Sequence, residues 1–344
     1  MDAREAREHH AVLASLMEIQ QQNRRQWPLS LALGQFISLL ITGTGVFSTM
    51  LISDAIVAPA AQSSLNYVLL CGLFIVALPG LCREGFAAPI WYYLLWAVCD
   101  VQGNYLVVMA YQYTSVASVM LLDGFSIVCI MLLSWALLDA RYTRWHIFAT
   151  LVCIVGLSLT VLSDTLMANS RPALRGPVWI GDMLVIMGSA MYGMSNVLQE
   201  RLYKRHGCSQ LEALGMLGLL GGIISAAQAA ILERHALASC RWSLASLAAL
   251  VGYQLCLFAM YVLTSRFLQT ADATVFNLSL LTADAYSAVF SWIVQGLRPT
   301  AVFAVAFTTT VSGLVLYHLQ PAPTTNINRS RSVSCSDHRQ AHGG

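Results

Sequence analysis

Charge is the scarcest property of this 344-residue sequence. Only 10% of the residues are Asp, Glu, Lys or Arg, and 18 of the 19 basic residues are Arg, with Lys204 as the exception. A soluble domain usually carries about 25% charged residues. Hydrophobic residues make up 57% of the chain, and the mean hydropathy is +0.63. A soluble fold would lack the polar surface to cover so much apolar material, so the composition predicts a membrane protein.

Motifs for catalysis, metal binding and nucleotide binding are lacking too. The nine cysteines form no CxxC pair, and the sequence has no HExxH motif, nucleophile elbow or phosphate loop. The net charge is only +2, and no basic patch suggests nucleic acid as a partner. We therefore predict a protein that is not an enzyme and has no metal, no cofactor and no nucleic-acid partner. Without an ATP-binding motif, any transport would be driven by a gradient or by an exchanged solute.

Long apolar runs are what the sequence has in abundance. About 20 mostly apolar residues cross a hydrocarbon core of about 30 Å as a helix, and a helix satisfies its own backbone groups in lipid. The sequence predicts ten such helices, over 29–51, 65–82, 90–111, 115–138, 145–163, 178–203, 211–232, 243–265, 271–295 and 300–319. They are flanked by an N-terminal tail over 1–28 and a polar C-terminal tail over 320–344, which we expect to be disordered.

The distribution of basic residues predicts the orientation. With the N-terminus in the cytosol, 14 of the 19 Lys and Arg residues fall on the cytosolic side. Basic residues are enriched in cytosolic loops, so this bias places both termini in the cytosol. The tails contribute half of the 14, which makes the bias from the loops alone smaller.

A weak internal repeat divides the ten helices into two halves, 29–163 and 178–319. Three short matches recur at a shift of 156 or 157 residues: Thr114–Val119 with Thr270–Val275, Ser134-Trp135 with Ser291-Trp292, and Gly156 with Gly313. Five helices in each half would place the second half upside down relative to the first. Inverted repeats of this kind are typical of transporters, whose substrate site lies between the halves.

Polar residues inside the predicted helices are the candidates for a substrate pathway. Charged groups at membrane depth are costly and usually functional, whereas a single Ser, Thr or Asn more often joins helices by hydrogen bonds. Eight residues are selected as pathway candidates: Gln35, Asp100, Asn104, Tyr111, Asp123, Asn196, Asn277 and Asp284.

These candidates suggest complementary roles toward a solute. The three asparagines offer donors and acceptors to a base or a sugar, and Tyr111 could stack on a ring. Asp100, Asp123 or Asp284 could accept a proton or pair with a cationic group. Asp284 has apolar residues at the equivalent position of the first half, so we expect the halves to differ there.

Several of these residues lie in longer motifs that resemble a known family. The segments Asp100–Ser115, Leu121–Asp123, Leu33–Thr44 and Asn277–Asp284 resemble solute carrier family 35, subfamily F, and the resemblance extends from about Leu29 to Leu319. It implies a drug/metabolite-transporter fold, with ten transmembrane helices in two inverted five-helix repeats. It also implies a solute of the nucleoside or nucleobase class, because subfamily F has been linked with such solutes.

We consider two alternatives to this function. A Golgi nucleotide-sugar antiporter would need cationic residues for a diphosphate, and no Arg or Lys lies well inside a predicted helix. A membrane receptor or scaffold without transport would not require carboxylates on several helices. The partners we expect are a small-molecule solute and the lipid bilayer. A homodimer is also possible. The protein is expected in the plasma membrane or in a Golgi or endosomal membrane.

The orientation can be tested with terminal tags. We expect tags at Met1 and Gly344 to be digested by protease added to sealed microsomes, because both termini face the cytosol. A protected C-terminal tag, or glycosylation at Asn328, would contradict this topology.

Overall fold

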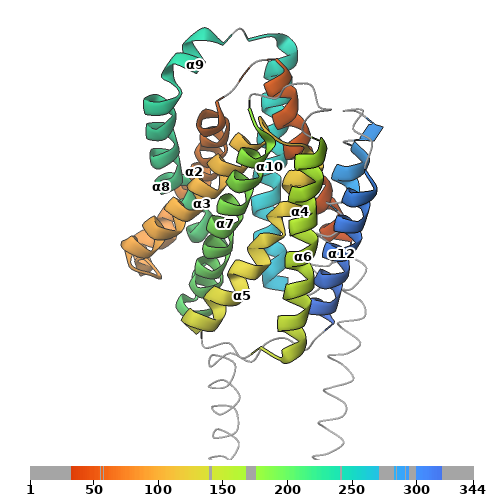
Figure 1. Cartoon of the computed structure of the whole chain (residues 1–344). Coiled ribbons are helices and arrows are strands. Elements are labelled where there is room, and N and C mark those ends of the chain that lie inside the picture. The colour runs from red at the N-terminus through yellow and green to blue at the C-terminus, as the bar shows by residue number, and fades with distance from the viewer. Residues whose placement is uncertain are drawn as a thin grey trace, which may run out of the picture.

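A computed structural model describes residues 32–54, 56, 58–138, 142–167, 176–240, 242–270, 283, 285–290, 292–293 and 300–319. Within these ranges the fold is entirely helical and contains no strand. The long helices run roughly along one direction, and the short helix α9 lies at one end of the bundle (Figure 1).

The described helices follow the predicted runs closely. The first spans Ala32–Ser53. The others are α2 (Pro59–Glu84), α3 (Ile90–Ala110), α4 (Val116–Asp123), α5 (Phe125–Leu138), α6 (Arg144–Met167), α7 (Val178–His206), α8 (Gln210–Leu232), α9 (Arg234–Ser239), α10 (Leu244–Thr270) and α12 (Ala301–His318). Eight spans among the described residues are long and apolar enough to cross a membrane, and Ala301–Tyr317 is a shorter apolar helix.

Two predicted runs differ from the helices observed. The run 65–82 is part of a longer helix that starts at Pro59, because Glu233 binds the exposed backbone N–H groups of its first turn. The run 115–138 is divided at Gly124, where the Gly124 N–H donates to the Leu121 carbonyl oxygen at 3.2 Å. Most of the predicted helix 271–295 and both tails lie outside the described residues.

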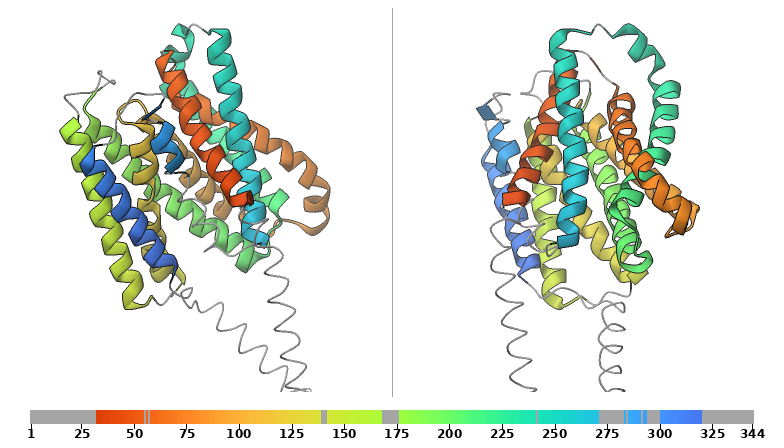
Figure 2. Two further views of the ribbon diagram at one scale, coloured as in Figure 1. Left: turned by 90° about the vertical axis from the view of Figure 1, so that its right-hand side faces the viewer. Right: turned by 180° about the vertical axis from the view of Figure 1, so that it is seen from behind.

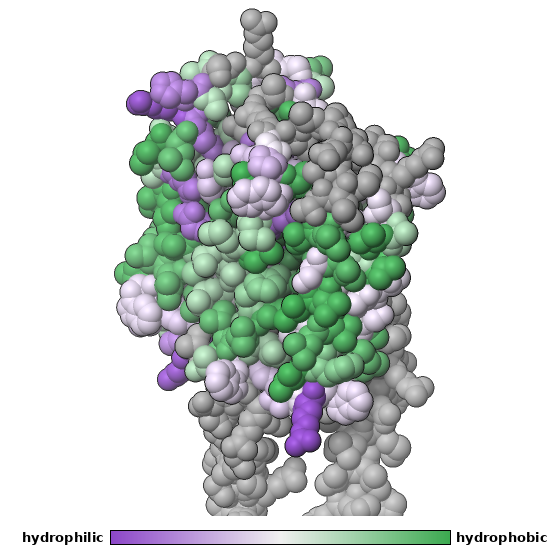
Figure 3. All heavy atoms as spheres, viewed as in Figure 1, coloured by the Kyte–Doolittle hydropathy of each residue, from purple (hydrophilic) through white to green (hydrophobic). Residues whose placement is uncertain are grey.

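The outer surface of the bundle is apolar. In the view of Figure 3, hydrophobic residues cover most of the described surface between the two ends, and hydrophilic residues gather toward the ends. Large apolar side chains such as Ile231, Ile293 and Trp135 are more than half exposed. Such a surface is stable against lipid tails but not against water, which fits a membrane-spanning protein.

Helices α2 and α8 pack with their backbones in direct contact. A Cβ atom on Gly215 would lie 2.6 Å from the Cα atom of Phe74, and one on Gly218 would overlap the backbone of Leu70 and Cys71. Residue numbers rise along one helix as they fall along the other, so the pair is antiparallel. Small residues allow this close approach, which provides much of the packing energy between helices in lipid.

Glu233 joins the same pair at one end. Its two carboxylate oxygens accept hydrogen bonds from the N–H groups of Ala60 and Ala61, at 2.8 and 2.9 Å. Burial raises the pKa of the Glu233 carboxyl, and these two hydrogen bonds act against the increase. The N-terminus of a helix favours negative charge, so Glu233 stabilises the start of α2 from the end of α8.

Helices α6 and α12 form a second pair, visible side by side in all three views (Figures 1 and 2). A Cβ on Gly156 would meet the backbone of Thr310 and Ala306, and one on Gly313 would meet the backbone of Cys153 and Ala149. These contacts are reciprocal at a shift of 157 residues: Gly156 corresponds to Gly313, Cys153 to Thr310, and Ala149 to Ala306. The close approach therefore uses equivalent positions of both helices.

The α2–α8 contact predicts unequal effects of two similar substitutions. Gly218→Ala should lower the free energy of unfolding by about 1–3 kcal/mol, because the new methyl group overlaps the α2 backbone. Gly222→Ala is the matched control on the same helix, since its Cβ would lie 3.7 Å from the nearest atom. Thermal unfolding in detergent measures both, and equal midpoints would contradict the close contact.

Candidate functional site

Asp100 lies near the middle of α3 and is 5% exposed. Its Oδ2 atom accepts hydrogen bonds from the hydroxyl groups of Tyr67 in α2 and Tyr261 in α10, at 2.8 and 2.6 Å. Its Oδ1 atom accepts a hydrogen bond from the Ser195 hydroxyl in α7, at 3.1 Å. One carboxylate therefore joins four helices, and these donors replace the water that the group would bind outside the membrane.

Asn104 completes the network one turn further along α3. Each of the two tyrosine hydroxyls uses its single hydrogen on Asp100, so each must accept a hydrogen bond from Asn104. The Nδ2 atom of Asn104 lies 2.9 Å from the Tyr67 oxygen and 2.8 Å from the Tyr261 oxygen. Both amide hydrogens are used in this way, which leaves this nitrogen no free donor for a solute.

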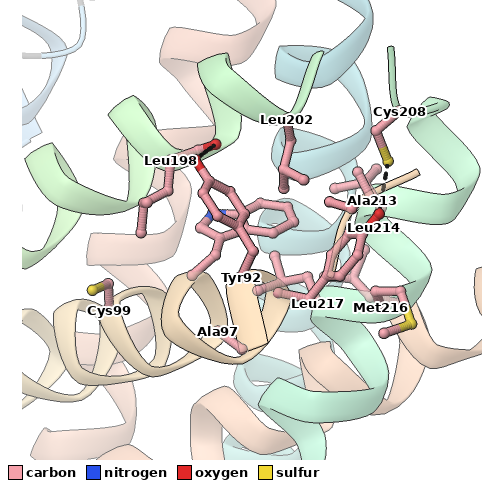
Figure 4. Close-up of a cluster of buried hydrophobic side chains, with 14 of the residues drawn as sticks. Tyr92, Ala97, Cys99, Leu198, Leu202, Cys208, Ala213, Leu214, Met216 and Leu217 are labelled. Atoms are coloured by element: carbon pink, nitrogen blue, oxygen red, sulfur yellow. Dashed lines mark hydrogen bonds between the residues drawn. The ribbon is translucent and has the colours of Figure 1, made fainter. Parts of the chain in front are cut away.

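The network borders a large hydrophobic cluster formed by α3, α7 and α8. Trp96 donates from its indole Nε1 to the Ser195 oxygen at 2.9 Å. In Figure 4 the Tyr92 hydroxyl points to the Leu198 carbonyl oxygen, and apolar side chains of α8 such as Leu214 and Leu217 face the same region. The Trp96 and Tyr92 polar groups thus each have a hydrogen-bond partner inside the cluster, as expected for buried polar groups.

Asp123 differs from Asp100 in its surroundings. It is the last residue of α4 and is followed by Gly124, a single turn residue with helical backbone angles that leads into α5. Its Oδ1 atom accepts a hydrogen bond from the Ser189 hydroxyl in α7 at 2.9 Å, and its Oδ2 atom has no hydrogen bond within the described part of the chain. Asp123 lies deep in the bundle, yet its side chain is only half-buried. Asp123 therefore borders an interior space.

Tyrosines surround the space next to Asp123. Tyr192 and Tyr261 also lie deep and are half-buried, whereas Tyr111 and Tyr253 are buried. Tyr192 lies near both Asp100 and Asp123, and Tyr111 lies near Asp123 and Tyr253. The interior thus combines one accessible carboxylate with aromatic rings and hydroxyl groups, a set that could bind a ring with polar substituents.

The structure brings some of the predicted pathway residues together but not others. Asp100, Asn104, Tyr111 and Asp123 lie in the interior described above. Gln35 in the first helix accepts a hydrogen bond from the exposed Tyr286 at 2.9 Å, and Asn196 is exposed on α7. Asn277 and Asp284 lie outside the described residues, so their positions stay predictions.

Sequence reasoning missed three partners of Asp100. Tyr67, Ser195 and Tyr261 were not selected because each stands in an apolar run where a tyrosine or serine is common. The sequence indicates them only weakly. A hydroxyl group at membrane depth needs a hydrogen-bond partner, and the Asp100 carboxylate is the strongest acceptor in the neighbouring helices. As for metals, the described residues contain no group of three or more His, Cys, Asp or Glu side chains that could hold an ion.

These observations define the class of protein. Apolar spans, an apolar outer surface and a polar interior make the chain a multi-pass integral membrane protein. The family model SLC35F, described as solute carrier family 35, matches residues 22–319. The chain therefore belongs to solute carrier family 35, and to its subfamily F. Members of this family are transporters and not enzymes, so membership suggests a solute transporter.

Two vertebrate relatives agree with this assignment. Solute carrier family 35 member F2 of Mus musculus is 37% identical over 301 residues, which cover 86% of this chain and 80% of the relative. Solute carrier family 35 member F2 of Xenopus tropicalis is 34% identical over 305 residues, covering 85% and 77%. An uncharacterized family 35 member of Schizosaccharomyces pombe is 35% identical over 305 residues, covering 86% of this chain and 59% of that protein.

A solved structure shares the fold. A protein described only by the words "Crystal structure of protein" superposes with a TM-score of 0.58 at 18% sequence identity. The match covers 85% of this chain and 97% of that one. At this identity the likeness concerns the fold alone.

The two carboxylates are expected to differ in their effect on stability. Asp100→Ala should lower the free energy of unfolding by about 3 kcal/mol, because it leaves buried hydroxyl donors on Tyr67, Tyr261 and Ser195 without their acceptor. Asp123→Ala removes the acceptor of one hydroxyl and should cost less than about 1 kcal/mol. Unfolding in detergent compares the two variants, and a larger loss for Asp123→Ala would contradict this difference.

Proposed function

We propose that the chain is a secondary transporter that moves a small organic metabolite, of the nucleoside or nucleobase class, by alternating access. Family membership supports the transporter class, and the sequence offers no ATP-binding motif to drive it. The solute class rests on the chemistry of the interior and on the resemblance to subfamily F.

The position of Asp123 is the observation that carries this proposal. A carboxylate is expensive at membrane depth, and a purely structural one would be expected to saturate its oxygens as Asp100 does. Asp123 instead has a single hydrogen-bond partner among the described residues, and its side chain is only half-buried. In transporters, the substrate site commonly lies near the middle of the membrane and is lined by such polar groups.

The surroundings of Asp123 favour a solute that donates hydrogen bonds. When it is ionised, the Asp123 carboxylate carries a negative charge and acts only as a hydrogen-bond acceptor. An N–H or O–H group, or a protonated nitrogen, would therefore be attracted there. The half-buried ring of Tyr192 offers a face on which a base could stack. Asn104 would act mainly by holding the tyrosines in place.

A nucleotide-sugar antiporter is disfavoured by the same electrostatics. A diphosphate requires cationic partners, but the described arginines of the membrane helices lie near helix ends, as Arg201 and Arg266 do. Two aspartates at the centre of the bundle would repel such a solute. A receptor or scaffold, the remaining alternative, would have no need for an accessible carboxylate inside the bundle.

We further propose ten helices arranged as two inverted five-helix repeats, 29–163 and 178–319. The reciprocal contacts of Gly156 and Gly313 support this architecture, because a two-fold axis in the membrane plane would generate contacts of that kind. The shift of 157 residues equals the one found in the sequence matches. Cytosolic termini, cytosolic tails over 1–28 and 320–344, and a possible homodimer belong to the same proposal.

Uptake into proteoliposomes tests the proposed function. Purified protein should accumulate a solute from a pooled panel of nucleosides, nucleobases and nucleotide sugars, and Asp123→Asn should reduce the initial rate at least about tenfold. Asp54→Asn, the same change at an exposed carboxylate at the end of the first helix, serves as the control and should have no effect. Unchanged uptake by Asp123→Asn would remove Asp123 from the site, and uptake of nucleotide sugars alone would favour the antiporter.

A further inference from the structure

Helix α10 is held by two different kinds of contact along its length. Its first half interlocks with the first helix: a Cβ on Gly252 would lie 2.6 Å from the Phe47 ring, and a Cβ on Gly43 would lie 3.0 Å from the Cys256 sulfur. The Gln254 side chain also donates to the Gln62 carbonyl oxygen of α2 at 2.6 Å. Close interlocks of this kind resist sliding, because neighbouring atoms have no space to move into.

The second half of α10 combines apolar packing, as at Val262, with hydrogen bonds to three other helices. Tyr261 binds Asp100 and Asn104 of α3, as described above. The Ser265 hydroxyl lies 2.7 Å from the Tyr203 hydroxyl of α7. The Val262 carbonyl oxygen accepts a hydrogen bond from the Gln210 side chain of α8 at 3.0 Å. Positions 261, 262 and 265 share one helical face, and we call this set of contacts the α10 seam.

The α10 seam lies toward one end of the bundle. Arg205 near the end of α7 and Arg266 in α10 lie at this end, and basic residues mark the cytosolic side. Ser265 is fully buried, and Tyr261 and Val262 are half-buried. Asp123 lies nearer the opposite end, only two turns from the start of α4 at Val116. A solute bound at Asp123 would therefore have to pass the seam to reach the cytosol.

The chemistry of the seam allows it to open. Each contact is a side-chain hydrogen bond that water can replace, and such a bond stabilises a closed state only modestly. The hydroxyl groups of Tyr203, Tyr261 and Ser265 can form hydrogen bonds with water as readily as with their present partners. A closed but reversible contact between a substrate site and one side of the membrane is what alternating access requires.

We propose that the α10 seam is the cytosolic gate of the transporter, and that Tyr261 is the residue that positions it. This inference rests on the proposed function. Tyr261 is suited to the role because it links the gate to Asp100 and Asn104 in the centre of the bundle. When the seam opens, Asp100 loses one of its donors, and water entering from the cytosol takes that place.

Labelling of a cysteine in the seam tests the gate without a known solute. Val262→Cys keeps the backbone carbonyl that Gln210 binds, and a membrane-impermeant maleimide reports its exposure in inside-out vesicles. Adding Tyr261→Phe should raise the labelling rate about fivefold, the factor expected when one hydrogen bond is lost from a two-state equilibrium. Tyr203→Phe should act in the same direction. The same variants without Val262→Cys give the background from the nine native cysteines.

Tyr92→Phe is the matched control. It also removes the hydrogen bond of a tyrosine hydroxyl in α3, but the partner of this hydroxyl is the Leu198 carbonyl oxygen, which is not one of the seam contacts. Equal labelling in the Tyr261, Tyr203 and Tyr92 variants would overturn the gate. If Tyr261→Phe fails to reach the membrane, the Tyr203 variant decides the question.

Uptake measured in parallel separates the two proposals. Wild-type protein that takes up no solute, with labelling that still responds to Tyr261→Phe, would contradict the transporter proposal and leave the seam as a moving contact. Normal uptake with labelling that responds to neither seam variant would contradict the gate alone.

Discussion

The Asp100 carboxylate is the group on which the centre of this bundle depends. Inside a membrane no bulk water is available, so the charge has to be met by protein donors. Tyr67, Tyr261 and Ser195 supply them from three helices, and Asn104 holds the two tyrosine hydroxyls in the required direction. In the structure described, the hydroxyls therefore join α2, α3, α7 and α10 around the candidate site.

Around this centre the helices are joined by two kinds of contact with different mechanical properties. Glycines bring the backbones of α2 and α8, and of α6 and α12, into direct contact. Glu233 adds a hydrogen-bonded cap at one end of the α2–α8 pair. The second half of α10 is held instead by exchangeable side-chain hydrogen bonds. Since close-packed backbones resist sliding and hydrogen bonds can be exchanged with water, the second kind of contact is the better place for a conformational change.

The two interior aspartates show how a similar residue type can serve different ends. Both carboxylate oxygens of Asp100 accept hydrogen bonds from other helices. These bonds organise the bundle and offset the free-energy cost of a charged group at membrane depth. Asp123 is only half-buried and has one hydrogen-bond partner among the described residues, an arrangement with no evident structural benefit. The sequence does not distinguish the two residues, because both are carboxylates in apolar helices. Their separation into a structural and a solute-facing residue came from the donors that other helices bring to each.

The sequence by itself determined the class of fold. The length of each apolar run decides whether it can span the membrane, and this property is local, so the described helices follow most of the predicted runs closely, with 65–82 and 115–138 as the exceptions. The repeat signal at Gly156 and Gly313 was visible too, because a close helix contact requires a small residue at each of these positions. Part of the site was also within reach, since Asp100, Asn104 and Asp123 are conspicuous in an apolar sequence.

Only the tertiary structure decided which side chains meet. Tyr67, Ser195 and Tyr261 are up to 194 residues apart along the chain, and nothing local marks them as partners of one carboxylate. The break at Gly124 was likewise hidden, because α4 and α5 are both apolar and read as one run. Hydropathy records how favourably a residue enters lipid, whereas a hydrogen-bond partner depends on the direction and rotation of packed helices, which arise only when all of them assemble.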